Sequence, residues 1–165
     1  MIKSQDVLVL AALMGGKVES LPFAKIAEKA KLSVSEAFAA VGRLQESSLV
    51  NSERRVNRCN AIEFLTHALR YICPPRYGEE KAIGMPAAFA APVAADDFAV
   101  AGEIPVWPCD DGNTSGRPLE PIYPSAPKAA AADRTIYDNL ALFDMLRGGR
   151  LRELAYAADK LKEVL

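Results

Sequence analysis

The stretch from Val7 to Met14 constrains the fold more than any other part of this 165-residue chain, because every residue from Val7 to Leu13 is apolar. Ser4 can serve as an N-cap and Gly15-Gly16 as a stop, so we predict a helix over Ser4–Met14. A helix that is apolar all round must be covered on several sides. We therefore expect a second subunit or the C-terminal helices to pack against it.

The same stretch is too short to cross a bilayer, and only Lys3 precedes it as a basic residue, so neither a membrane anchor nor a signal peptide is predicted. Cys59, Cys73 and Cys109 are odd in number and form no C-x-x-C pair. Free thiols of this kind are typical of a reducing compartment. We expect a cytoplasmic protein that makes no membrane contact.

Two further helices and a short two-stranded turn are predicted next. A helix should run from Pro22 to about Ala30, followed by a tight turn at Lys31-Leu32. Ser33-Val34-Ser35-Glu36 fits a capping box and begins a helix that ends near Ser47. Its core face is predicted to contain Val34, Ala37, Val41 and Leu44. Leu49–Asn51 and Arg54–Val56 are predicted to form two very short strands.

This order of elements is that of a winged helix-turn-helix, in which the third helix enters the major groove of DNA. The stretch FAKIAEKAKLSVSEAFAAVGRLQESSLV, within Leu21–Val56, resembles the helix-turn-helix of MarR-type and related small winged-helix regulators. The resemblance implies DNA contacts from the third helix and from the arginines of the wing. The implied DNA-binding residues are Ser33, Ser35, Glu36, Phe38, Ala39, Gly42, Arg43, Arg54, Arg55 and Arg58.

Charge supports DNA binding only locally. The chain has a net charge of −1, whereas residues 1–60 hold nine lysines and arginines against six acids. The predicted recognition helix offers Arg43, Gln45 and Phe38 where several basic or amide side chains are usual. Arg43 is the best candidate for a phosphate or guanine contact. A winged helix that binds a protein partner through Phe38 is the alternative.

The remainder of the chain is predicted to be extended and then helical. A fourth helix should span Asn57–Ile72, with Ile62, Leu65, Leu69 and Ile72 on one apolar stripe, and Pro74-Pro75 should end it. Ten of the eleven prolines lie in 74–128. We predict a mainly α fold with minor β, comprising a winged-helix domain over 1–73, a Pro-rich extended region with short strands over 74–132, and a C-terminal αα-hairpin over 133–165. Residues 110–116 are predicted to turn a hairpin between Val106-Trp107 and Leu119.

No catalytic, metal or cofactor site is predicted. The single histidine, His67, lies on a polar helix stripe with Glu63 and Arg70, and the acidic run at 110–116 lacks the spacing of a calcium loop. No convergent set of titratable residues indicates an enzyme.

Two functions remain open from the sequence. The first is a DNA-binding transcriptional regulator that binds double-stranded DNA as a homodimer. The second is an antitoxin or adaptor that binds a cognate toxin or another protein through 74–165, with or without DNA autoregulation. Trp107 and Tyr123 are the candidate partner contacts, although a place in the core is favoured for Trp107, which lies between Pro105 and Pro108.

Overall fold

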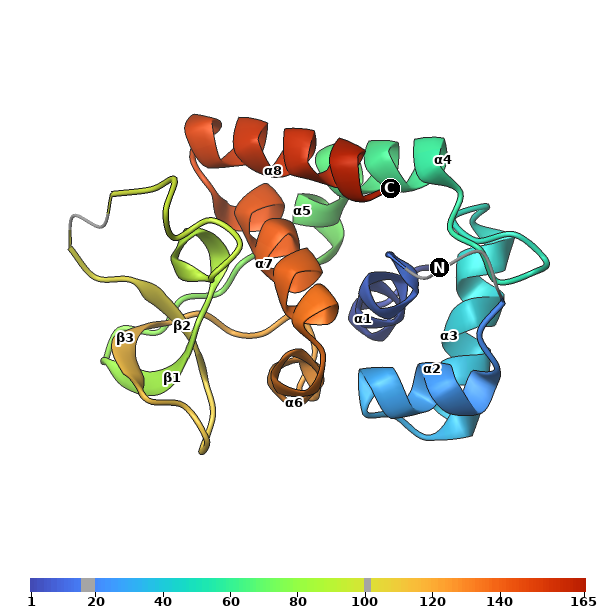
Figure 1. Ribbon diagram of the computed structural model, residues 1–165, viewed down its shortest axis with the longest axis horizontal. Helices are drawn as coiled ribbons and strands as arrows, with labels where there is room; N and C mark the ends of the chain where they lie inside the picture. Colours follow the sequence, from blue (N-terminus) through green and yellow to red (C-terminus); the bar gives the residue numbers. More distant parts are fainter. Residues whose placement is uncertain (16–19, 100–101) are drawn as a thin grey trace.

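The computed structural model describes all residues except 16–19 and 100–101, and it confirms a mainly α fold with minor β. Helix α1 (Ser4–Leu13) lies at the centre, between α2 and α3 on one side and α7 on the other (Figure 1). Its residues from Val7 to Ala11 are fully buried. Helix α7, one of the C-terminal helices, covers the apolar side of α1 that α2 and α3 leave open. The packing of α1 therefore does not require a second subunit.

The N-cap of α1 is Lys3 rather than the predicted Ser4. The Lys3 N–H donates to the Asp6 carboxylate at 2.8 Å, and the Asp6 N–H donates to the Lys3 carbonyl at 2.9 Å, so both donors are satisfied without a serine hydroxyl. Within the described residues, no helix is long and apolar enough to span a membrane.

Helices α2 (Phe23–Ala30) and α3 (Val34–Glu46) are joined by a tight turn. Lys31 adopts the left-handed conformation at φ 54°, and the N–H groups of Lys31 and Leu32 donate to the carbonyls of Glu28 and Ala27. These two bonds end α2 as a Schellman motif. The predicted capping box of Ser33 and Glu36 is present and begins α3.

The core face of α3 consists of Ala37, Ala40, Val41 and Leu44. Val34, which the periodicity placed on this face, is 52% exposed, so that prediction was wrong. Val34 begins the helix at the turn, and the alanines one and two turns further on are the residues that let α1 and α2 approach closely.

The predicted two-stranded wing is reduced to one bridge between Val50 and Val56. The Asn51 side chain accepts from the N–H groups of Glu53 and Arg55, and the Arg54 backbone has a left-handed φ of 62°. A side chain therefore holds this turn, which leaves few backbone groups to extend the strands.

The predicted fourth helix comprises α4 (Arg58–Glu63), the π-helical stretch η1 (Phe64–Ala68) and α5 (Leu69–Ile72). The extra residue of a π turn rotates everything after it relative to an α-helix. Leu65 and Leu69 remain buried, whereas Ile72 is exposed, which corrects the predicted stripe.

The middle of the chain folds into a small sheet of β1 (Ala82–Pro86), β2 (Pro105–Pro108) and β3 (Thr114–Pro118), with the short 3-10 turn η2 (Ala88–Ala90) after β1. Strand β1 pairs antiparallel with both others, and β2 and β3 pair with each other in parallel. The predicted hairpin between 106–107 and 119 is therefore wrong. Strand β2 pairs with β3 in parallel, so the two cannot be the arms of a hairpin. A Cβ on Gly84 of β1 would clash with the Trp107 carbonyl, so glycine is what lets β1 approach β2.

Residues 126–132, predicted to be extended, form helix α6 (Ala126–Ala132). Pro127 lies in its first turn, where a missing N–H is harmless, and alanines make up most of the rest. The predicted C-terminal hairpin is present as α7 (Arg134–Gly148) and α8 (Leu151–Val164). A Cβ on Gly149 would lie 2.4 Å from the Met145 carbonyl oxygen, so this joint requires glycine.

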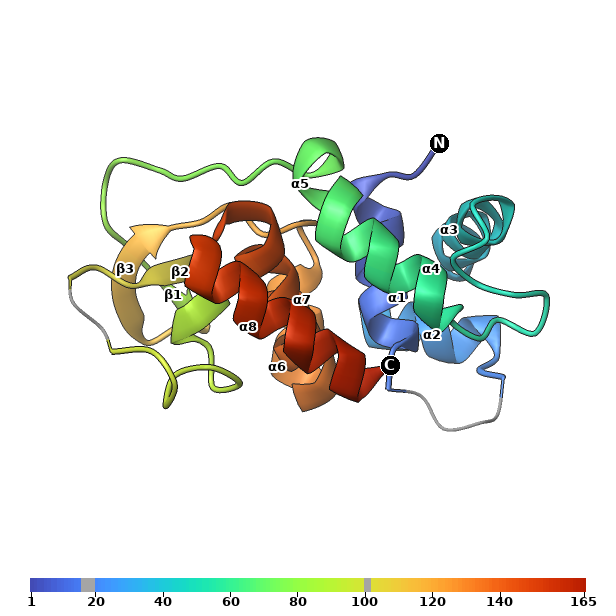
Figure 2. The ribbon, with the colours of Figure 1, turned by 90° about the horizontal axis from the view of Figure 1, so that it is seen from above.

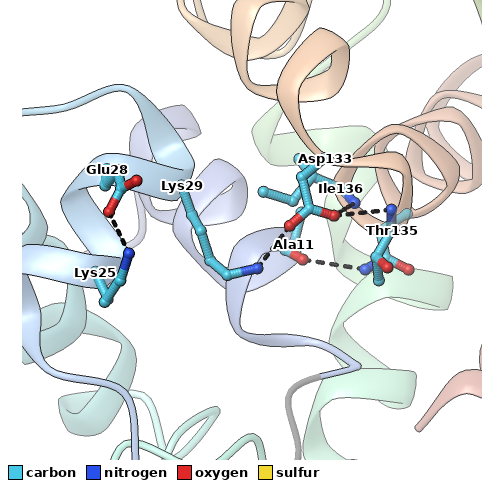
Figure 3. A network of polar contacts seen from close by, with 8 residues as sticks. Ala11, Lys25, Glu28, Lys29, Asp133, Thr135 and Ile136 are labelled. Atoms are coloured by element: carbon cyan, nitrogen blue, oxygen red, sulfur yellow. Dashed lines mark hydrogen bonds and ion pairs between the residues drawn. The ribbon is translucent and has the colours of Figure 1, made fainter.

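An ion pair joins the N-terminal helices to the C-terminal ones. Lys29 of α2 reaches Asp133 at 2.6 Å, and Asp133 also accepts from the N–H groups of Thr135 and Ile136 as the N-cap of α7 (Figure 3). Burial acts to raise the pKa of Asp133, but Lys29 and the two N–H groups outweigh it, so its pKa lies below the ordinary value. Asn139 of α7 adds a buried bond to the Ala11 carbonyl at the end of α1.

Asp133→Ala is expected to lower the free energy of unfolding at pH 7 by about 1–2 kcal/mol, because it removes a helix cap and a partly exposed ion pair. A lowered folded pKa gives stability that is present above the unfolded value of about 3.9 and is lost as pH falls through the folded value. Urea denaturation at pH 7 and pH 3 measures both. Asp138→Ala, which removes the exposed pair with Arg134, is the control. An equal loss in the two variants, or a loss from Asp133→Ala that is no smaller at pH 3 than at pH 7, would contradict the assignment.

Candidate nucleic-acid interface

The outer face of α3 lies at the end of the molecule farthest from the strands, in both views (Figures 1 and 2). Ser35, Phe38 and Ala39 are exposed on it, and Phe38 is 62% exposed. Apart from its two chain neighbours and the backbone of its own helix, no described atom lies within 4 Å of the position that a Cβ on Gly42 would take. Four of the predicted groove-facing residues thus share one open helix face.

The N-terminus of α3 carries a fixed negative charge. Glu36 accepts from the Ser33 hydroxyl at 2.6 Å, from the Ser33 N–H at 2.9 Å and from Gln5 at 3.1 Å. The Ser33 hydrogen bonds lower the pKa of Glu36, so this carboxylate is charged at neutral pH. The Ser33 and Ser35 hydroxyls lie 3.2 Å apart beside it. Glu36 therefore occupies the position at the helix N-terminus where a phosphate would otherwise be favoured.

Arg43 is engaged within the protein. Its Nε and Nη2 donate to the two carboxylate oxygens of Asp6 at 2.9 and 2.6 Å, and Asp6 is fully buried. The hydrogen bonds to Asp6 raise the pKa of Arg43 further. Only Nη1 is left outside this two-point pair, so the residue with the strongest predicted DNA contact is held against α1.

The arginines that follow α3 differ in their exposure to solvent: Arg54 and Arg55 lie in the wing, and Arg58 begins α4. Arg54 donates to the Leu21 carbonyl at 2.9 Å and lies 4.9 Å over the ring of Phe23, which in turn packs 5.0 Å from Phe38. Arg55 is exposed and makes a loose pair with Glu53 at 3.4 Å. Arg58 is exposed and donates through Nη2 to the Lys162 carbonyl at the end of α8.

Sequence reasoning missed Asp6, Gln5 and Phe23, which position Arg43, Glu36 and Arg54. The available signal was Asp6, the one charged residue of α1, which is followed by seven apolar residues and needs a partner when buried. The sequence-based prediction also missed Lys31, which is exposed at the turn before α3. It did not include the hollow of about 450 Å³ between α3 and the wing. Gln45, Ser48 and Asn51 line that hollow.

The two residues predicted to contact a partner, Trp107 and Tyr123, are buried and half-buried within this chain. Trp107 is 1% exposed and its indole N–H donates to Asp144 at 2.6 Å, so the core alternative holds and the partner-anchor prediction for Trp107 was wrong. Tyr123 is half-buried, and its hydroxyl accepts from Gln5. The Pro-rich middle packs on α7 of its own chain.

The described residues contain no group of three or more histidine, cysteine, aspartate or glutamate side chains placed to hold a metal ion. No protein-family model, no curated protein and no solved structure matches this chain.

Proposed function

We propose that this protein is a DNA-binding transcriptional regulator and that 1–73 is a winged helix-turn-helix. The observation that carries the proposal is the open face of α3, with Ser35, Phe38, Ala39 and Gly42, beside the wing. The left-handed turn at Lys31 and the capped start of α3 support a helix-turn-helix geometry, in which α2 crosses the backbone and α3 enters the major groove.

The contacts with bases and the contacts with phosphates would come from different residues. Phe38 and Ala39 suit contact with thymine methyl groups, and Glu36 can accept from the cytosine amine. Arg55, Arg58 and Lys31 reach phosphates and supply the electrostatic attraction. A second copy on an adjacent half-site would raise affinity, although the packing of α1 does not call for one.

The test is fluorescence anisotropy with the DNA upstream of the protein's own coding sequence, over a series of salt concentrations. We expect salt-sensitive binding, and we expect Arg55→Gln/Arg58→Gln to weaken it and to reduce the slope of log K against log salt by about two. Arg76→Gln/Arg134→Gln removes two exposed arginines elsewhere and should leave the slope unchanged. Absence of binding, or an equal slope in both double variants, would contradict the proposal.

A protein partner for the same face is the second candidate, favoured by the exposed Phe38 in contact with Phe23 and Arg54, since aromatic residues and arginine are enriched at interfaces. The antitoxin or adaptor alternative would then act through α3 rather than through 74–165. Phe38→Ser separates the two. Lost binding to the product of the adjacent gene, with DNA affinity unchanged, would favour the protein partner.

A further inference from the structure

A cavity of about 470 Å³ lies away from α3, between the small sheet and the joint of α7 and α8. This volume is within the range of about 300–1,000 Å³ that small-molecule sites occupy. Its lining combines three aromatic rings with charged side chains from three separate segments. The residues that matter here are Tyr77, Phe89, Phe98, Arg117, Arg150 and Glu153.

The aromatic residues of the cavity are held by contacts with α8. Phe98 packs edge-on against Tyr156 of α8 at 5.2 Å, and the Tyr156 hydroxyl donates to the Val93 carbonyl. Phe89 lies 6.2 Å from Phe98. The Arg152 guanidinium lies 5.1 Å over the Phe98 ring. These contacts tie the segment after η2 to α8 and fix the orientation of Phe98 at the cavity.

The charged side has an excess of cations. Neither Arg117 of β3 nor Arg150 before α8 forms an ion pair with a described carboxylate, whereas Glu103, which also lines the cavity, is paired with Lys81 at 3.0 Å. Arg117 instead lies 4.7 Å over the ring of Tyr77. Glu153 is the remaining acid, and burial raises its pKa. Two guanidinium groups in one cavity suit a doubly charged anion such as a phosphate monoester.

We propose that this cavity binds a nucleoside monophosphate, with the base stacked on Phe89 and Phe98 and the phosphate held by Arg117 and Arg150. Glu153 accepts from an N–H group of the base or a hydroxyl of the ribose. A nucleoside monophosphate should bind more tightly than either of its parts. Inorganic phosphate lacks the ring that stacks, and a nucleoside lacks the charge that the arginines bind. This site is independent of the DNA interface proposed for α3.

The experiment is isothermal titration calorimetry of the full chain with AMP, GMP, CMP and UMP, then with inorganic phosphate and with the nucleoside of the tightest binder. We expect at least one monophosphate to bind, and its nucleoside and inorganic phosphate each to bind at least tenfold more weakly. No binding by any of the four at millimolar concentration would overturn the proposal. Equal binding by the nucleoside or by inorganic phosphate would also overturn it.

Variants locate the binding. Arg117→Gln/Arg150→Gln should raise the Kd at least tenfold, and Phe98→Leu, which keeps an apolar side chain against Tyr156, should weaken binding without removing the phosphate contacts. Arg76→Gln/Arg134→Gln is the matched control and should leave the Kd unchanged. Circular dichroism melts establish that each variant is folded. An unchanged Kd in the folded Arg117→Gln/Arg150→Gln variant would place the ligand elsewhere and overturn the assignment.

Discussion

Replacing Arg147 by methionine is expected to lower the free energy of unfolding by about 3–5 kcal/mol, because it strands a buried carboxylate. Arg147 and Asp144 are both almost completely buried, and Arg147 Nε donates to Asp144 at 2.7 Å. The other end of the guanidinium donates to the Glu120 carbonyl at 2.6 Å. Trp107 supplies the second donor to Asp144. One arginine therefore joins α7 to the Pro-rich segments that pack on it.

Urea denaturation of Arg147→Met beside Arg134→Met measures this effect. Arg134 pairs with Asp138 on the surface of the same helix, so its loss should cost about 1 kcal/mol or less. Arg147→Met/Asp144→Asn should be more stable than Arg147→Met alone, since a neutral amide still accepts from Trp107. Equal losses in the two single variants would contradict the buried network.

The same variant has a pH signature. Burial raises the pKa of Asp144, while Arg147 and Trp107 act against that rise. Without Arg147 the carboxylate should take up a proton more readily in the folded state. A raised folded pKa means that the penalty is fully present above that pKa and is relieved as pH falls through it towards the unfolded value of about 3.9. The deficit of Arg147→Met relative to the native chain should therefore shrink in acid; a deficit that grows would be contrary to this cause.

Replacing Asp6 by alanine is expected to have two opposite effects. Stability should fall by about 2–4 kcal/mol, because the variant loses a buried two-point pair with Arg43 and the cap on the Lys3 N–H. If α3 binds DNA as proposed, the released Arg43 becomes available to a phosphate or base. DNA affinity at low salt should then rise, and the salt slope should steepen by about one.

Thermal denaturation and anisotropy titrations below the melting temperature test the two effects separately. Asp6→Asn keeps an acceptor for the Lys3 N–H but loses the charge, so its stability should lie between those of Asp6→Ala and the native chain. Unchanged stability in Asp6→Ala would show that the pair with Arg43 contributes nothing. Weaker DNA binding by a folded Asp6→Ala would mean that Arg43 serves DNA binding from its present position.

The sequence alone determined those features whose physics acts within a few residues. The Ser33–Glu36 capping box, the glycine joint at 148–149 and the need to cover α1 on every side all followed from local chemistry. One prediction failed for a reason that also lies within a few residues. The π turn at 64–68 changed the face on which Ile72 lies, and hydrophobic periodicity assumes an uninterrupted α-helix.

Only the tertiary structure decided which partners meet. Arg43 was predicted to be the main DNA contact because it is the basic side chain of the recognition helix and its planar guanidinium suits a phosphate or guanine; its partner Asp6 lies 37 positions away. Helix α7 covers α1, and the indole N–H of the buried Trp107 donates to Asp144. Strands β2 and β3, expected to form a hairpin, pair in parallel, and β1 pairs antiparallel with both. Ion pairs, sheet register and burial join residues far apart in the chain. That is why α3 could be predicted from the sequence, whereas the charges available on its open face could not.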